Sequence, residues 1–124
     1  MLIERHETLD AEGAKPIISG VVAVGNFVYV KGVTGAPVGD ITDQTRQVLQ
    51  EIDRLLAVAG SDKSKLLTAQ VWLSDMRMFR QHNLAWNEWV DPANPPVRAC
   101  VEAHLFDDAG EPGLLVEIMV TATR

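Results

Sequence analysis

The 124-residue sequence has little of what marks nucleic-acid-binding or disulfide-bonded proteins. Its single cysteine, Cys100, cannot form an internal disulfide. It has no cluster of lysine and arginine, and 17 acidic residues against 11 basic ones give a formal net charge of −6. Affinity for nucleic acid rests largely on clustered positive charge, so this acidic balance argues against nucleic acid as a partner.

Membrane and secretion signals are also lacking. No apolar run approaches the roughly 20 residues that span a bilayer. The first residues lack a basic segment followed by a long apolar run, so we expect no signal peptide. We therefore expect a cytoplasmic protein with no membrane partner. The three histidines, His6, His82 and His104, do not have the spacing of a metal site, so no metal is expected. P-loop, dinucleotide-binding and nucleophile-elbow motifs are absent.

The periodicity of apolar residues predicts one mixed α+β domain over residues 1–124. Two short runs of β-forming residues flank Gly25-Asn26 and predict a hairpin. The last two strands, joined by a polar loop, are expected to form a second hairpin. The order β-β-β-α-β-α-β-β predicts a six-stranded sheet with two helices on one face. The expected strands are 2–8, 21–24, 27–31, 65–73, 97–106 and 114–122, and the helices are 42–59 and 76–90.

Each predicted helix has one apolar side. In the first, the core positions recur at helical spacing, Thr42 or Asp40 can cap the start, and Gln44 belongs to the polar side. The second is expected to turn Phe79, His82, Asn83, Trp86 and Val90 inward. Two helices cover only one face of a sheet. Since several strands are apolar on both faces, we expect the other face to pack against another subunit.

The stretch from Pro95 to Glu102 contains the leading candidate for a binding site. Two prolines favour an extended entry into a strand. On that strand Arg98, Cys100 and Glu102 share one face. Arg98 can bind a carboxylate ligand bidentately. The alternative is an internal salt bridge to Glu102 or Glu117, and the residues alone leave both open.

Three further residues each have a functional and a structural interpretation. Glu117 lies in a strongly apolar strand, where it is either a general base or the ion-pair partner of Arg98. Cys100 is more often a small buried residue than a nucleophile. Lys31 ends an apolar strand, where it is either solvated or part of a site.

Several motifs make the chain resemble the RidA/YjgF family of enamine/imine deaminases, also known as L-PSP endoribonucleases. Residues 96–102 (Pro-Val-Arg-Ala-Cys-Val-Glu) resemble the family's P-A-R-x-x-V-E signature. Residues 115–118 (Leu-Val-Glu-Ile) resemble its V-E-I-E closing strand, and residues 25–30 resemble its G-N-x-V-F-x-S-G hairpin. The resemblance also includes Asp75 to Asn83 and covers nearly the whole chain.

The resemblance implies a chorismate-mutase-like fold and a homotrimer with a central barrel, whose sites lie between subunits. It implies hydrolysis of 2-enamino or 2-imino acids to 2-keto acids and ammonia, without a cofactor. Arg98 would bind the substrate carboxylate and Glu117 would position water, while Cys100 and Asn83 would line or support the pocket. The alternative is a family member that binds a small carboxylate metabolite without catalysis.

The chain departs from the family pattern at three positions near the implied site. Lys31 stands where a serine is usual, and Ile18 and Trp86 each stand where a tyrosine is usual. These residues would change the pocket that takes small substrates. Lys31 would add a second cation near Arg98, which either suits a dicarboxylate or fills the pocket by pairing with Glu117. We take the preference for dicarboxylates as the hypothesis.

Overall fold

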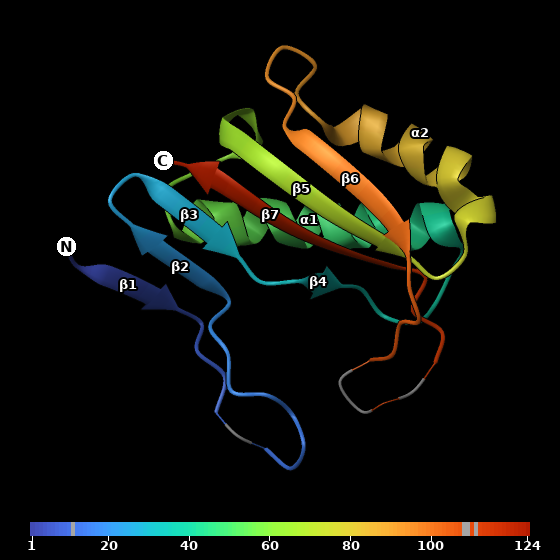
Figure 1. Ribbon diagram of the computed structural model, residues 1–124, viewed down its shortest axis with the longest axis horizontal. Helices are drawn as coiled ribbons and strands as arrows, with labels where there is room; N and C mark the ends of the chain where they lie inside the picture. The colour runs from blue at the N-terminus through green and yellow to red at the C-terminus, as the bar shows by residue number, and fades with distance from the viewer. Residues whose placement is uncertain (11, 108–109, 111) are drawn as a thin grey trace.

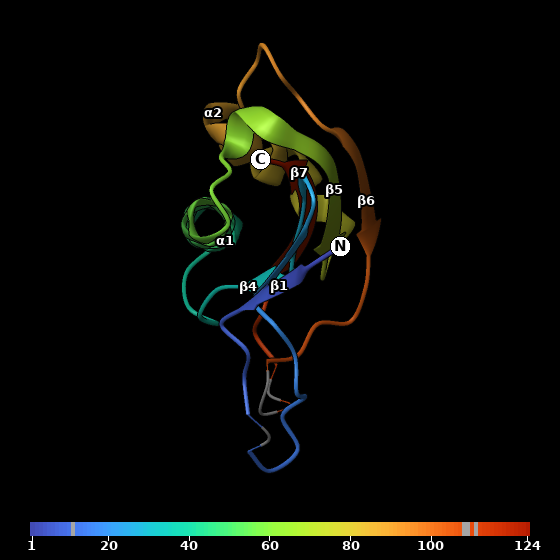
Figure 2. The same ribbon diagram turned by 90° about the vertical axis from the view of Figure 1, so that its left-hand side faces the viewer.

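A computed structural model describes residues 1–10, 12–107, 110 and 112–124. One mixed sheet of seven strands carries two α-helices, both on the same face (Figures 1 and 2). The predicted fold class is therefore confirmed; the extra strand is the two-residue β4. The elements are β1 (Ile3–His6), β2 (Val21–Val24), β3 (Phe27–Val30), β4 (Val33–Thr34), α1 (Ile41–Val58), β5 (Leu66–Leu73), α2 (Phe79–Trp89), β6 (Val97–Glu102) and β7 (Val116–Thr123), with 3₁₀ turns at Lys63–Lys65 and Met76–Met78.

The strands lie in the order β1-β2-β3-β7-β5-β6, and β4 pairs with β7. The hairpin at Gly25-Asn26 forms as predicted, with Val24 opposite Phe27. The prediction of a second hairpin at the end of the chain is wrong. β6 runs parallel to β5 at the edge of the sheet, and β7 lies on the other side of β5. Four alternate residues of β7 are buried, so this strand belongs at the centre of the sheet.

Helix α1 packs on the sheet through Val48, Leu49, Ile52, Leu55 and Leu56, all buried as the spacing predicts. A capping box fixes its start. The side chain of Asp40 accepts a hydrogen bond from the backbone N–H of Asp43, and the side chain of Asp43 accepts one from the backbone N–H of Asp40. The helix thus begins with an acidic N-terminus, which suits the positive end of its dipole.

The placement of Gln44 on the solvent side was wrong, because this side chain is buried. Its Nε2 donates to the carbonyls of Gly39 (3.3 Å) and Gly113 (3.1 Å), and its Oε1 accepts from the N–H of Leu115 (2.9 Å). Gln44 therefore joins the start of α1 to the segment that leads into β7. A periodicity argument misses such a residue because the backbone groups that satisfy it are far away in sequence.

We expect Gln44→Leu to lower the free energy of unfolding by about 2–4 kcal/mol, because it leaves buried backbone groups without partners. Chemical denaturation measures this loss. Gln50→Leu is the matched control, since Gln50 is exposed on the same helix and should change stability by less than about 0.5 kcal/mol. Equal effects of the two substitutions would contradict the structural role of Gln44.

Helix α2 connects β5 to β6 and lies beside β6 (Figure 1). Its inward side is the predicted one: His82 and Trp86 are buried, and Phe79 and Val90 pack against the core. Ala85 is buried as well, which was not predicted. The side chain of Asp75 caps the 3₁₀ turn that precedes the helix by accepting from the N–H of Arg77.

No element of the described residues covers the face of the sheet away from the helices (Figure 2). Strand alternation places six large apolar residues on it, each 44–71% exposed: Ile3, Phe27, Tyr29, Val97, Val101 and Met119. We call these six residues the outer apolar face. Exposed apolar surface of this extent is typical of interaction sites. Within the described residues, no helix is long and apolar enough to cross a membrane.

Candidate functional site

Arg98 of β6 points toward α2 and is held there by two neutral acceptors. One terminal nitrogen lies 3.1 Å from Nε2 of His82, and the other donates to Oδ1 of Asn83 at 2.7 Å. The centre of the guanidinium lies 5.0 Å from the ring of Trp86 and 6.0 Å from that of Phe79, within cation–π range. Three predicted site residues, Arg98, Asn83 and Trp86, are therefore brought together. With His82 they form what we call the arginine half-site.

The side of β6 that carries Arg98 and Cys100 faces the helices, and the apolar side faces outward. Val97 and Val101 are exposed on the outer apolar face, while Cys100 packs against the core. This arrangement reverses the usual burial of a half-apolar strand. It follows from the polar inward residues of α2, which give Arg98 hydrogen-bond partners that the outer face lacks.

No ion pair recorded among the described residues involves Arg98. Arg46, Arg54, Arg77 and Arg124 each pair with a carboxylate, whereas the exposed Arg5 and Arg80 have no ion pair recorded among these residues either. Arg98 differs from these two in being half-buried. Glu102, one candidate partner, instead accepts from the backbone N–H of Met76 at 2.9 Å. Burial lowers the pKa of Arg98, but a guanidinium stays charged at neutral pH. Arg98 is thus a half-buried cation, fixed in orientation, that can take an anionic ligand.

Cys100 lies on the same side of β6 as Arg98 and is half-buried. Burial raises the pKa of its thiol, and Arg98 offsets this in part. Because the thiolate is the nucleophilic form, the environment of Cys100 does not favour covalent catalysis. Its side chain is better described as part of the wall beside Arg98.

Glu117 lies on the opposite face of the sheet from Arg98. Val116 and Ile118, its neighbours on β7, are buried toward the helices, so strand alternation turns the half-buried Glu117 the other way. Its carboxylate lies against Gly32, where a Cβ would overlap Oε2. Glycine is therefore required at position 32 for this carboxylate to keep its place. One subunit alone does not bring Arg98 and Glu117 together.

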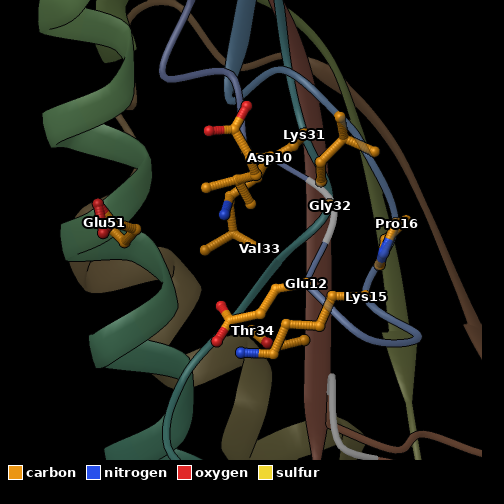
Figure 3. A pocket seen from close by; sticks show the side chains of 11 residues that line it. Asp10, Glu12, Lys15, Pro16, Lys31, Gly32, Val33, Thr34 and Glu51 are labelled. Atoms are coloured by element: carbon orange, nitrogen blue, oxygen red, sulfur yellow. The ribbon is translucent and has the colours of Figure 1, made fainter.

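Gly32 also lines a cavity of about 640 Å³ between the N-terminal loop, the segment after β3, and α1. Lys31 and Ile18 line it too, so these two predicted site residues lie together. Figure 3 shows Asp10, Lys15 and Lys31 across this cavity from Glu51 of α1. Neither Arg98 nor any other member of the arginine half-site lines it. Glu117 is not among the residues that line this cavity, and Gly32 is the residue that both contacts Glu117 and lines the cavity. We call Glu117, Gly32, Lys31 and Ile18 the glutamate half-site.

Two further residues of the candidate site were not predicted: His82, which contacts Arg98, and Thr45, whose Oγ1 lies 3.0 Å from Nδ1 of His82. His82 was placed on the inward side of α2 but was not linked to Arg98. The available signal was two consecutive polar residues, His82 and Asn83, on a side that packs on the core, since buried polar groups need partners. Among the described residues, no three His, Cys, Asp or Glu side chains gather as metal ligands.

Comparison with known proteins agrees with the motifs. The family model for "Endoribonuclease L-PSP" matches residues 10–124. A RutC family protein of Haemophilus influenzae is 53% identical over 81 residues, which cover 65% of this chain and 66% of the relative. The RutC family protein YoaB of Escherichia coli is 38% identical over 104 residues, covering 84% and 88%.

Solved structures show the same fold. A member of the YjgF protein family from Neisseria meningitidis superposes with a TM-score of 0.88 at 35% sequence identity, covering 100% of this chain and 96% of that one. The motifs around Arg98 and Glu117, the sheet order and these comparisons agree. The chain therefore belongs to the RidA/YjgF family, which includes the RutC and L-PSP proteins.

Proposed function

We propose that the protein hydrolyses 2-imino acids, formed from 2-enamino acids, to 2-keto acids and ammonia. The observation that carries this proposal is the environment of Arg98. Its guanidinium is held by His82 and Asn83 and has no carboxylate partner among the described residues. Such a site suits the carboxylate that every 2-imino acid has next to its reactive carbon.

The position of Glu117 leads us to propose that the complete site lies between two subunits. Arg98 and Glu117 are on opposite faces of one sheet, and the outer apolar face needs a partner. We propose that a second copy of the chain covers this face and that its Arg98, which lies on the edge strand β6, comes near the first copy's Glu117. The trimer implied by the family resemblance is one such assembly.

The reaction needs only water as a second reactant. Arg98 of one subunit binds the carboxylate and so places the C=N carbon beside a water near Glu117 of the other. The water oxygen bonds to that carbon and the nitrogen takes a proton, which gives a carbinolamine. The carbinolamine hydroxyl then loses its proton and becomes the C=O of the keto acid, while the nitrogen takes a second proton and leaves as ammonia when the C–N bond breaks. Fixing the reactants in this way lowers the barrier chiefly through proximity. Glu117 contributes by orienting the water and accepting its proton.

The proposal predicts that two inactive variants restore activity when mixed. Arg98→Ala and Glu117→Gln should each release little ammonia from imines generated by an amino-acid oxidase. If the subunits are unfolded together at a 1:1 ratio and refolded, about a quarter of the shared sites should contain both native residues. The rate of ammonia release should therefore recover to about 25% of the wild-type value.

Mixing the separately refolded variants is the control and should restore nothing unless subunits exchange. No recovery after joint refolding, despite mixed oligomers, would contradict a shared site.

If the wild-type protein binds a keto acid but does not accelerate ammonia release, the protein is instead a carboxylate-binding member of the family. The cavity residue Ile18, where a tyrosine is usual, is the feature that favours this second function.

A further inference from the structure

His82 is fully buried between the two helices and the sheet, and both of its ring nitrogens have partners. Nδ1 lies 3.0 Å from Oγ1 of Thr45 on α1, and Nε2 lies 3.1 Å from a terminal nitrogen of Arg98 on β6. The three side chains form a continuous chain of hydrogen bonds that runs from α1, through α2, to the edge strand. Thr45 is itself fully buried.

The chemistry of the partners fixes where the protons lie. A guanidinium has N–H donors and no acceptor, so Nε2 of His82 must accept from Arg98. In a neutral imidazole the other nitrogen then carries the proton, and Nδ1–H donates to the hydroxyl of Thr45. A protonated His82 would instead place an N–H against an N–H of Arg98 and bring two cations together.

We propose that His82, held by Thr45 as the neutral Nδ1–H tautomer, is a positioning residue that orients Arg98 for its carboxylate ligand. This role rests on the proposed function of Arg98. His82 and Asn83 follow one another on α2, and each accepts a hydrogen bond from a different terminal nitrogen of the guanidinium. Three of its five N–H groups remain for a ligand. Without the acceptor on His82, the guanidinium is free to turn about its Asn83 contact.

The surroundings of His82 keep it neutral. Burial, and secondly the charge of Arg98, lower its pKa from 6.5 to about 4. The polar groups against it are the hydroxyl of Thr45 from α1 and the guanidinium of Arg98 from β6. Asn83 follows it on α2, and Cys100 lies on the same side of β6 as Arg98. The imidazole therefore acts as a fixed acceptor across the neutral pH range.

The affinity of the intact protein for pyruvate, measured by calorimetry, tests this role. In His82→Gln the amide oxygen can accept from Arg98 and its NH₂ can donate to Thr45, so affinity should stay within about threefold of wild type. In His82→Leu the acceptor is lost, and affinity should fall about tenfold or more. Thr45→Val keeps the side-chain shape but removes the hydroxyl that accepts from Nδ1–H. His82 is then no longer held in one tautomer, so pyruvate binding should weaken. Wild-type affinity in His82→Leu or Thr45→Val would overturn the proposal.

The ¹⁵N chemical shifts of the His82 ring provide a readout that needs no ligand. We expect a protonated Nδ1 and an unprotonated Nε2 from pH 8 to about pH 5, with titration only near pH 4. A protonated Nε2 at pH 7 would overturn the proposal. Pyruvate binding without ammonia release would overturn the deaminase function alone, because neither the affinity nor the tautomer depends on catalysis.

Discussion

Replacing Arg98 with lysine is expected to lower kcat/KM for imine hydrolysis by at least about 100-fold. A guanidinium binds a carboxylate through two parallel N–H···O bonds, whereas an ammonium is a point charge without that geometry. Hydrogen bonds to charged groups contribute about 1.5–3 kcal/mol each, and 1.4 kcal/mol corresponds to a factor of ten. Lysine would also lose the simultaneous contacts to His82 and Asn83 that hold the side chain in place.

The assay is ammonia release from imines produced by an amino-acid oxidase, and pyruvate affinity should fall in parallel. Arg80→Lys is the matched control: Arg80 is exposed on α2, and this change should leave both quantities unaltered. Circular dichroism would show that each variant folds. Full activity in a folded Arg98→Lys protein would mean that Arg98 does not bind the substrate carboxylate.

The second large effect is expected on assembly. Met119→Asp should convert the oligomer to a monomer of 13.6 kDa in analytical ultracentrifugation. Met119 is 44% exposed on β7, a central strand, and belongs to the outer apolar face. If another subunit covers this face, the aspartate would be buried without a partner, at a cost of several kcal/mol for each copy. Ammonia release should be lost with the oligomer, because the proposed site is shared.

Leu84→Asp is the control for this experiment. Leu84 is 65% exposed on α2, on the helical side of the molecule, so its replacement should leave the oligomer intact. A wild-type protein that is already monomeric at micromolar concentration would contradict the proposed assembly. So would a Met119→Asp variant that keeps the wild-type mass.

Local patterns predicted most of the fold. The core side of α1, the inward side of α2 and the hairpin at Gly25-Asn26 follow from spacing and turn residues, because neighbours in sequence decide them. Strand neighbours were harder to predict. β6 and β7 are consecutive in the chain, yet β5 lies between them, because pairing depends on burial across the whole sheet.

For the candidate site too, local patterns predicted some features and not others. Arg98, Asn83, Cys100 and Trp86 were predicted, and the structure places them together around β6 and α2. Their separation from Glu117 was not predicted, because one-residue alternation on β7 decides which face that side chain takes. Lys31 lines a cavity that does not include Arg98 of the same subunit. The expected preference for dicarboxylates requires both cations in one site, so it stays a prediction.

The residues of the arginine half-site lie close to one another in the sequence. This affects how members of this family can diverge. Arg98 and the α2 residues that hold it come from one continuous stretch, residues 79–98. The glutamate half-site instead collects residues 18, 31, 32 and 117 from separate segments. Substitutions at positions 18 and 31 can therefore accumulate without moving the arginine. Under the proposed function, such substitutions would change the range of substrate side chains that the site accepts and would leave carboxylate recognition by Arg98 unchanged.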